Sequence, residues 1–272
     1  MTLTPKPIRT TVLQKLLTLG LAVVTGVIVI LTNLQSNITI ASDSNLLTKQ
    51  SQYASDLITS LPSSPTSSLP SFPPPQAHPL PPTLAQWQDI KNSGDYFSHV
   101  SPTKVGYLVW SQFPVKVYIE PSNTLTGQQA EAWVNNVLEA VKEWNTYLPL
   151  VITEKPEIAD ITIVRKAPPL QLNPSSKIPR ARSAQTTYNY ISKNNLLSHS
   201  FIILLSPSQT GQYLTAAIRH ELGHALGIWG HSPLQTDALY FSQVRNPSPI
   251  SPRDVNTLKR VYEQPTSLGW KL

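Results

Sequence analysis

The most informative stretch of the chain is residues 212–232, which read QYLTAAIRHELGHALGIWGHS. Leu214, Ile218 and Leu222 recur in it at helical spacing, which predicts a helix whose apolar face packs against a sheet. On that helix His220 and His224 are four residues apart, so they lie one turn from each other on the same face. Their imidazoles can therefore bind one divalent ion together.

The residues around this histidine pair complete the pattern of a catalytic metal site. Glu221 follows the first ligand, where it can accept a proton from a water on the ion without taking a coordination position. Gly227 can adopt a positive φ that ends the helix, which lets His231 return as a third ligand. Three protein ligands leave one position of a tetrahedral zinc ion open to water, so we predict one catalytic zinc ion. The alternative is a pair of surface histidines, with Glu221 making an ordinary contact on the helix face.

Strands are predicted on the amino-terminal side of this stretch. Residues 113–120 (FPVKVYIE) alternate apolar and polar side chains, as a strand with one solvated face does. Further strands are predicted at residues 158–164, 184–191 and 201–205, the last of which is apolar enough to lie centrally. Together with the helices, these strands predict an α/β (α+β) domain.

Two further helices are predicted. The longer covers residues 130–148, where apolar side chains recur at helical spacing and two tryptophans serve as core anchors. A capping box is expected just before it. The shorter helix follows the sequence SPRD, residues 251–254, in which proline occupies the first turn. The two tryptophans are Trp133 and Trp144. The expected capping box consists of Thr126 and Gln129. The start of the shorter helix consists of Ser251, Pro252 and Asp254.

The composition excludes several kinds of site. The chain of 272 residues has no cysteine, so disulfides, zinc–thiolate sites and cysteine nucleophiles are excluded, and a metal site must use His, Asp or Glu. Lys and Arg number 21 and Asp and Glu 15, which gives a net charge of +6. Nucleic-acid-binding proteins concentrate their basic residues on one face or helix, so this dilute charge does not indicate a nucleic-acid partner.

The amino-terminal part carries an export signal or a membrane anchor. Residues 16–34 contain no charged side chain and follow a cluster of cations. The stretch is slightly shorter than the roughly 20 residues of a spanning helix and longer than the roughly 7–15 apolar residues of a signal peptide. Residues 1–41 are therefore a hydrophobic anchor helix or a signal peptide cleaved near Ala41. Both interpretations place the rest of the chain outside the cytoplasmic membrane.

Composition also predicts where the folded domain begins. Residues 61–83 are rich in proline and serine, which favours extended conformations and buries little apolar surface. We therefore predict a disordered linker over residues 42–83. An N-terminal extension follows at residues 84–104, and the domain itself covers residues 105–272.

The chain resembles the matrixin-like branch of the metzincin metallopeptidases. The segment HELGHALG, residues 220–227, matches the first eight positions of that family's H-E-x-x-H-x-x-G-x-x-H signature, and His231-Ser232 is similar to its closing H-S. The resemblance extends over residues 105–264 and includes the first strand, the backing helix, the A-D-I-x-I strand and the carboxy-terminal helix. It implies a metzincin-like mixed twisted sheet with a long backing helix, an active-site helix and a C-terminal helix.

The same resemblance implies a function. A metzincin-like chain would be a zinc-dependent metalloendopeptidase that hydrolyses peptide bonds by zinc-activated water, with Glu221 as general base. A strand near residues 181–187 would form the sheet edge that pairs with an extended substrate peptide. The partners would be a protein or peptide substrate and, through the N-terminal segment, a membrane. Two alternatives are a non-catalytic zinc-binding or surface-interaction module of the same fold, and a zinc hydrolase acting on cell-wall peptides.

The chain departs from the family pattern at the third histidine. Three residues separate Gly227 from His231, where the family has two. Gly230 is a second glycine in this turn, and its conformational freedom can absorb the extra residue. If it does not, Asp237 is the fallback ligand, because carboxylates also bind zinc.

The methionine turn of the family is also changed, since the chain's only methionine is Met1. Residues 237–240 (DALY) resemble that turn with Leu239 at the methionine position. An apolar side chain of similar volume there can pack below the site without binding the metal. Tyr240 is expected to be a structural phenol or to orient the substrate or the developing oxyanion.

A third departure concerns the segment that holds structural zinc and calcium in animal matrixins. The chain has no Asp or Glu between Ile161 and His220, and His199 stands there alone. Because calcium usually needs carboxylate ligands, we predict no structural zinc or calcium. The same segment is basic, which indicates a solvated loop face or a preference for an acidic substrate or anionic polymer. Its cations are Arg165, Lys166, Lys177, Arg180, Arg182 and Lys193.

Overall fold

The computed structural model describes residues 72–172 and 179–272. The predicted signal or anchor at residues 16–34 lies outside the described residues, as does the linker up to residue 71. The described residues belong to one unit, Ser68–Leu272. Across them, no helix combines the length and the apolar character needed to cross a membrane.

A five-stranded mixed sheet lies at the centre of this unit, in the order β2-β1-β3-β7-β6. Its first four strands are parallel, and β6 is antiparallel to β7 at the sheet edge. A separate antiparallel pair consists of β4 and β5. The strands are β1 (Val115–Ile119), β2 (Leu150–Ile152), β3 (Ile161–Arg165), β4 (Gln171–Leu172), β5 (Pro179–Arg180), β6 (Ala184–Lys193) and β7 (Leu196–Leu205). The predicted mixed α/β fold is confirmed.

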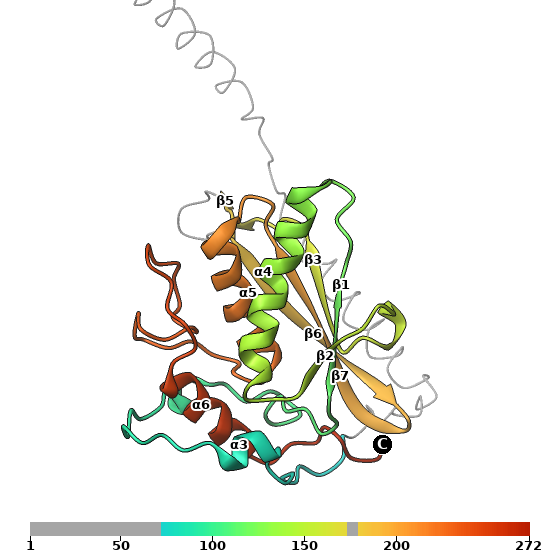
Figure 1. Ribbon diagram of the computed structural model, residues 1–272. Helices are drawn as coiled ribbons and strands as arrows, with labels where there is room; N and C mark the ends of the chain where they lie inside the picture. The colour runs from blue at the N-terminus through green and yellow to red at the C-terminus, as the bar shows by residue number, and fades with distance from the viewer. Residues whose placement is uncertain (1–71, 173–178) are drawn as a thin grey trace, which may run out of the picture. The chain divides into compact units, whose positions relative to one another are not determined.

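Two helices cover one face of the sheet. α4 (Gln128–Asn145) and α5 (Gly211–Ala225) lie side by side there (Figure 1). Each helix packs a stripe of buried apolar side chains against the sheet. A fully buried Val, Leu or Ile side chain contributes about 1.5–3 kcal/mol to stability relative to an exposed one. The Trp144 indole N–H donates a hydrogen bond to the Arg219 carbonyl oxygen at 2.8 Å, which fixes α4 against α5. Trp133 and Trp144 are both buried, as their predicted role in the core requires.

The start of α6 (Pro252–Tyr262) agrees with the sequence prediction, and the start of α4 differs from it. α6 begins at the predicted helix start, where Ser251 and Asp254 form a capping box. α4 begins without a side-chain cap, because its N-cap residue is Gly127, which has no side chain. The capping box predicted from Thr126 and Gln129 is therefore wrong.

Two short 3-10 helices are not among the predicted elements. The 3-10 helix η2 (Pro156–Ile158) precedes β3, so that strand begins at Ile161 and not at residue 158 as predicted. The 3-10 helix η1 (Phe97–His99) lies in the N-terminal extension and packs near α6.

The folded region begins earlier than residue 83, contrary to the predicted linker. Gln76 exchanges two backbone hydrogen bonds with Thr266, at 2.9 and 3.0 Å. The His78 ring stacks on Trp270 with ring centroids 4.6 Å apart. The short helix α3 (Pro82–Gln86) buries Leu84 completely. Proline favours an extended chain, and here that extended chain packs along the C-terminal segment.

Candidate metal centre

α5 ends in a turn that requires glycine. The Gly227 N–H donates to the His224 carbonyl at 3.1 Å, and the Ile228 N–H donates to the Gly223 carbonyl at 3.0 Å. These are the two hydrogen bonds of a Schellman motif. Gly227 has a φ of 131°, and a Cβ there would lie 2.8 Å from the Leu108 carbonyl oxygen. The positive φ predicted for Gly227 is confirmed.

His220 and His224 face each other from consecutive turns of α5. Their Nε2 atoms are 3.1 Å apart. The Nδ1 atom of His220 lies 3.0 Å from the Ala238 carbonyl oxygen, and that of His224 lies 2.8 Å from the Ile228 carbonyl oxygen. Carbonyl oxygens only accept hydrogen bonds, so each Nδ1 carries a proton and each neutral ring has a lone pair on Nε2. Two lone pairs at this distance repel each other unless a cation lies between them.

His231 joins this pair. One ligand atom from each of the three histidines lies within 4.8 Å of the other two. Zinc–nitrogen bonds of about 2.0–2.1 Å place neighbouring tetrahedral ligands about 3.3–3.4 Å apart, and the 3.1 Å between the first two Nε2 atoms is close to that spacing. An all-imidazole donor set also suits zinc. In the described part of the chain, this is the group of side chains that could hold a metal ion.

The extra residue before His231 is taken up in a tight turn. The Trp229 N–H donates to the Gly227 carbonyl, and the Gly230 N–H donates to the Ile228 carbonyl, both at 2.9 Å. Each bond joins residues two apart, so the chain turns within a very short span. The His231 ring centroid consequently lies 5.2 Å from that of His220 and 4.8 Å from that of His224.

The N-terminal extension supports the loop that carries His231. The Ser101 N–H donates to the Trp229 carbonyl oxygen at 3.0 Å. A Cβ on Gly230 would lie 2.0 Å from the His99 carbonyl oxygen. Gly230 does not have a positive φ, so the predicted need for conformational freedom is wrong here. Glycine is required because another segment of backbone approaches it closely.

The protein keeps two of the three imidazoles in the neutral form that binds metals. Burial moves the pKa of His224 well below its ordinary value, and the neighbouring histidines lower it further. The surrounding protein lowers the pKa of His231 to about 4, by desolvation first and then by the charges of His220 and Arg182. The His231 side chain nevertheless stays exposed to solvent.

Glu221 lies next to the histidine group and is itself buried, with 8% of the residue exposed. The Thr186 hydroxyl donates a hydrogen bond to its Oε2 atom at 2.6 Å. Burial raises the pKa of Glu221, while the charge of His220 and the hydrogen bond from Thr186 oppose that change. A carboxylate whose pKa is raised toward neutrality can both accept and return a proton.

The turn at residues 237–240 packs against α5 beside His220. Leu239 is completely buried, and a Cβ on Gly223 would lie 2.6 Å from its Cδ2 atom. Its neighbour Ala238 supplies the carbonyl oxygen that holds His220. Tyr240 is partly buried, and its ring lies 4.4 Å from that of Phe241.

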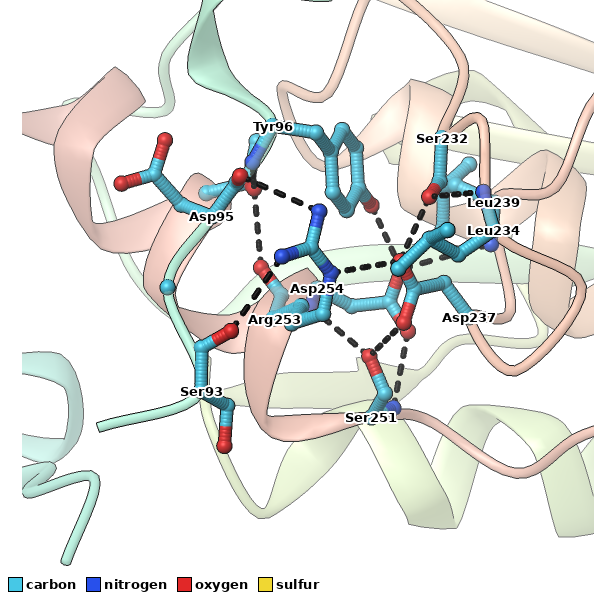
Figure 2. A network of polar contacts seen from close by, with 12 residues as sticks. Ser93, Asp95, Tyr96, Ser232, Leu234, Asp237, Leu239, Ser251, Arg253 and Asp254 are labelled. Carbon is cyan, nitrogen blue, oxygen red and sulfur yellow. Dashed lines mark hydrogen bonds and ion pairs between the residues drawn. The ribbon is translucent and has the colours of Figure 1, made fainter. Parts of the chain in front are cut away.

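Asp237, the fallback ligand, lies in a separate polar network. It accepts hydrogen bonds from the Ser232 hydroxyl, from the Ser251 hydroxyl at 2.8 Å and from Arg253 Nε at 3.0 Å (Figure 2). The metal group contains the three histidines and not Asp237. Since His231 reaches the pair, no substitute ligand is required. Asp237 instead fixes the start and end of the loop that follows His231.

The sequence does not reveal the second half of this network. Asp254 accepts hydrogen bonds from the Ala238 N–H at 2.8 Å and from the Tyr96 hydroxyl. Arg253 also donates to the backbone carbonyls of Ser93 and Asp95, at 3.2 and 3.1 Å (Figure 2). The network therefore ties the N-terminal extension and α6 to the turn that holds His220. In the sequence, Asp254 is visible only as part of a helix cap, and Tyr96 carries no recognisable pattern.

The function of the chain has to be inferred from the geometry of this site. No protein-family model matches the chain, and no curated protein is detectably similar to it. The structure itself establishes a mixed five-stranded sheet with packed helices and three clustered histidines that could hold a metal ion.

Proposed function

We propose that the protein is a zinc-dependent metalloendopeptidase with a metzincin-like catalytic domain. The observation that carries this proposal is the convergence of His220, His224 and His231, with Glu221 directly beside the first of them. Three imidazoles leave a tetrahedral zinc ion one open position, which is the arrangement of catalytic zinc sites. A purely structural site would use four protein ligands.

Each residue of the site has a separate role in the proposed hydrolysis. A bound zinc ion supplies Lewis acidity, which lowers the pKa of water and polarises a peptide carbonyl. The carbonyl groups of Ala238 and Ile228 hold His220 and His224 in the correct tautomer and orientation. Glu221 accepts the proton of the attacking water and returns it to the leaving amine nitrogen.

The edge strand β6 is the proposed site for the substrate backbone. It is the last strand in the order of the five-stranded sheet, and its Thr186 touches Glu221. An extended peptide that adds to this edge would therefore lie next to the histidine group. The substrates we propose are proteins or peptides bound in extended form.

The direct test is zinc content together with cleavage of casein and a peptide library, with and without a chelator. We expect one zinc ion per chain and cleavage that the chelator abolishes. Glu221→Gln should retain zinc and lose nearly all turnover, because it removes the base and not a ligand. Glu131→Gln, at an exposed position of α4, is the matched control and should behave like the wild type. A fully active Glu221→Gln variant would contradict the proposed role.

The same assays separate the two alternative functions. A non-catalytic module would bind zinc, or nothing, and cleave no substrate under any condition. A hydrolase acting on cell-wall peptides would release products from purified murein while leaving casein and the library intact.

We also propose that the domain acts outside the cytoplasmic membrane, held there by residues 16–34 or released after cleavage near Ala41. The uncharged stretch and the preceding cations support this location. Amino-terminal sequencing of the mature protein, with fractionation of membranes and medium, tests it. An intact amino terminus in the cytoplasmic fraction would contradict it.

A further inference from the structure

One hydroxyl group joins the edge strand of the sheet to the helix that carries the histidines. Thr186 of β6 donates a hydrogen bond to Glu221 Oε2 at 2.6 Å. We propose that Thr186 is a positioning residue for Glu221, which holds one carboxylate oxygen so that the other exchanges the proton. This inference rests on the proposed function, because it takes Glu221 as the general base.

Both ends of this hydrogen bond are fixed by regular structure. Thr186 pairs with Ile203 of β7 inside a continuous antiparallel ladder that runs from Ala184 to Lys193. The residue is 9% exposed, so its side chain is confined between the sheet and α5. Glu221 is equally buried on α5. A group held by two rigid elements positions its partner more accurately than one on a loop.

The Thr186 hydroxyl is suited to holding the Glu221 carboxylate in place. It has one proton to donate, and the carboxylate oxygen at 2.6 Å is closer than the Glu221 carbonyl oxygen at 3.1 Å. With Oε2 engaged in this way, Oε1 becomes the oxygen that accepts and returns the proton. Among the described residues, no other side chain donates a hydrogen bond to the Glu221 carboxylate. Without the Thr186 hydroxyl, the carboxylate would be restrained only by burial and by the Thr186 backbone.

Loss of the hydrogen bond between Thr186 and Glu221 should slow the chemical step. A reacting group displaced by about 1 Å can slow a reaction on the order of a hundredfold. Substrate binding along β6 depends on the backbone and does not use this hydroxyl. Loss of the hydrogen bond should therefore lower kcat and leave KM almost unchanged.

The test compares three variants in the zinc-loaded protein. Thr186→Val keeps the branched shape and removes the hydroxyl, and we expect kcat to fall by about ten- to a hundredfold with one zinc ion still bound. Thr186→Ser keeps the hydroxyl and should restore most of the activity. Thr126→Val, at an exposed position before α4 and away from β6, is the matched control and should leave kcat unchanged. If Thr186→Val does not fold, Thr186→Ala takes its place.

Crystal structures of the metal-free variants give a readout that does not depend on activity. We expect one Glu221 rotamer in the wild type and in Thr186→Ser, and several rotamers in Thr186→Val. An unchanged kcat and a single rotamer in Thr186→Val would overturn the inference. A higher kcat would also overturn it, because Thr186 would then restrain Glu221 away from the reaction. If the wild type cleaves nothing, the proposed function fails, and the rotamers alone still decide whether the hydroxyl positions the carboxylate.

Discussion

His199 should make the protein lose stability in mild acid. The residue is 1% exposed, and its ring stacks on Trp110 with centroids 4.0 Å apart. Neither ring nitrogen has a hydrogen-bond partner within the described residues. Burial without any compensating contact lowers the pKa of His199 to about 3. The imidazole is therefore neutral in the folded protein at any pH near neutrality.

The sign and size of the effect follow from proton linkage. An unfolded histidine has a pKa of about 6.5, so below that pH the unfolded chain binds a proton that the folded protein does not. The stability that His199 contributes is complete above about pH 6.5 and is lost as the pH falls toward the folded-state value of about 3. The slope is about 1.4 kcal/mol per pH unit, which amounts to about 2 kcal/mol at pH 5.

The assay is urea denaturation of the metal-free wild type and of His199→Phe at several pH values between 7.5 and 4.5. His224 and His231 titrate in both proteins, so their contributions cancel in the difference. We expect the free energy of unfolding of His199→Phe to fall less steeply with acid, by about 1.4 kcal/mol per pH unit below pH 6. His99→Gln, at an exposed histidine, should retain the wild-type slope. Parallel curves for His199→Phe and the wild type would refute the reasoning.

Three further predictions concern the residues around the metal centre. Gly230→Ala should destabilise the protein by about 1–3 kcal/mol and weaken zinc binding, because its Cβ would lie 2.0 Å from the His99 carbonyl oxygen; zinc titration and urea denaturation measure both. Asp237→Asn should destabilise it by about 1.5–3 kcal/mol, because Arg253 Nε loses its charged acceptor, yet bind one zinc ion per folded chain. A halved zinc content in the folded fraction would instead make Asp237 a ligand. Leu239→Met should cost less than about 1.5 kcal/mol and keep the zinc affinity, and a larger loss in denaturation would show that the turn is more tightly packed than volume alone implies.

The parts of the site that sequence predicts are those that depend on local spacing. The four-residue interval between His220 and His224 defines their common face once α5 forms. Gly227 ends that helix through hydrogen bonds within the same turn. The start of α6 is local as well, and it is found at the predicted residues Ser251, Pro252 and Asp254.

The parts that sequence misses depend on contacts between distant segments. The requirement for glycine at position 230 comes from the His99 carbonyl, which no spacing within the motif can indicate. Thr186 reaches Glu221 from a different strand, and Tyr96 reaches Asp254 from the N-terminal extension. The packing of residues 72–83 was missed for a similar reason, because a proline-rich composition predicts an extended chain and not the surface on which it packs.

The central claim is that three histidines hold one zinc ion with an open position, and X-ray absorption spectroscopy of the zinc-loaded protein tests it most directly. We expect one zinc ion per chain, bound by three imidazole nitrogens and one oxygen of water at about 2.0–2.1 Å. His231→Ala should lose one of the three imidazole contributions. A wild-type spectrum with two imidazoles, with four protein ligands, or with no specifically bound zinc would contradict a three-histidine zinc site.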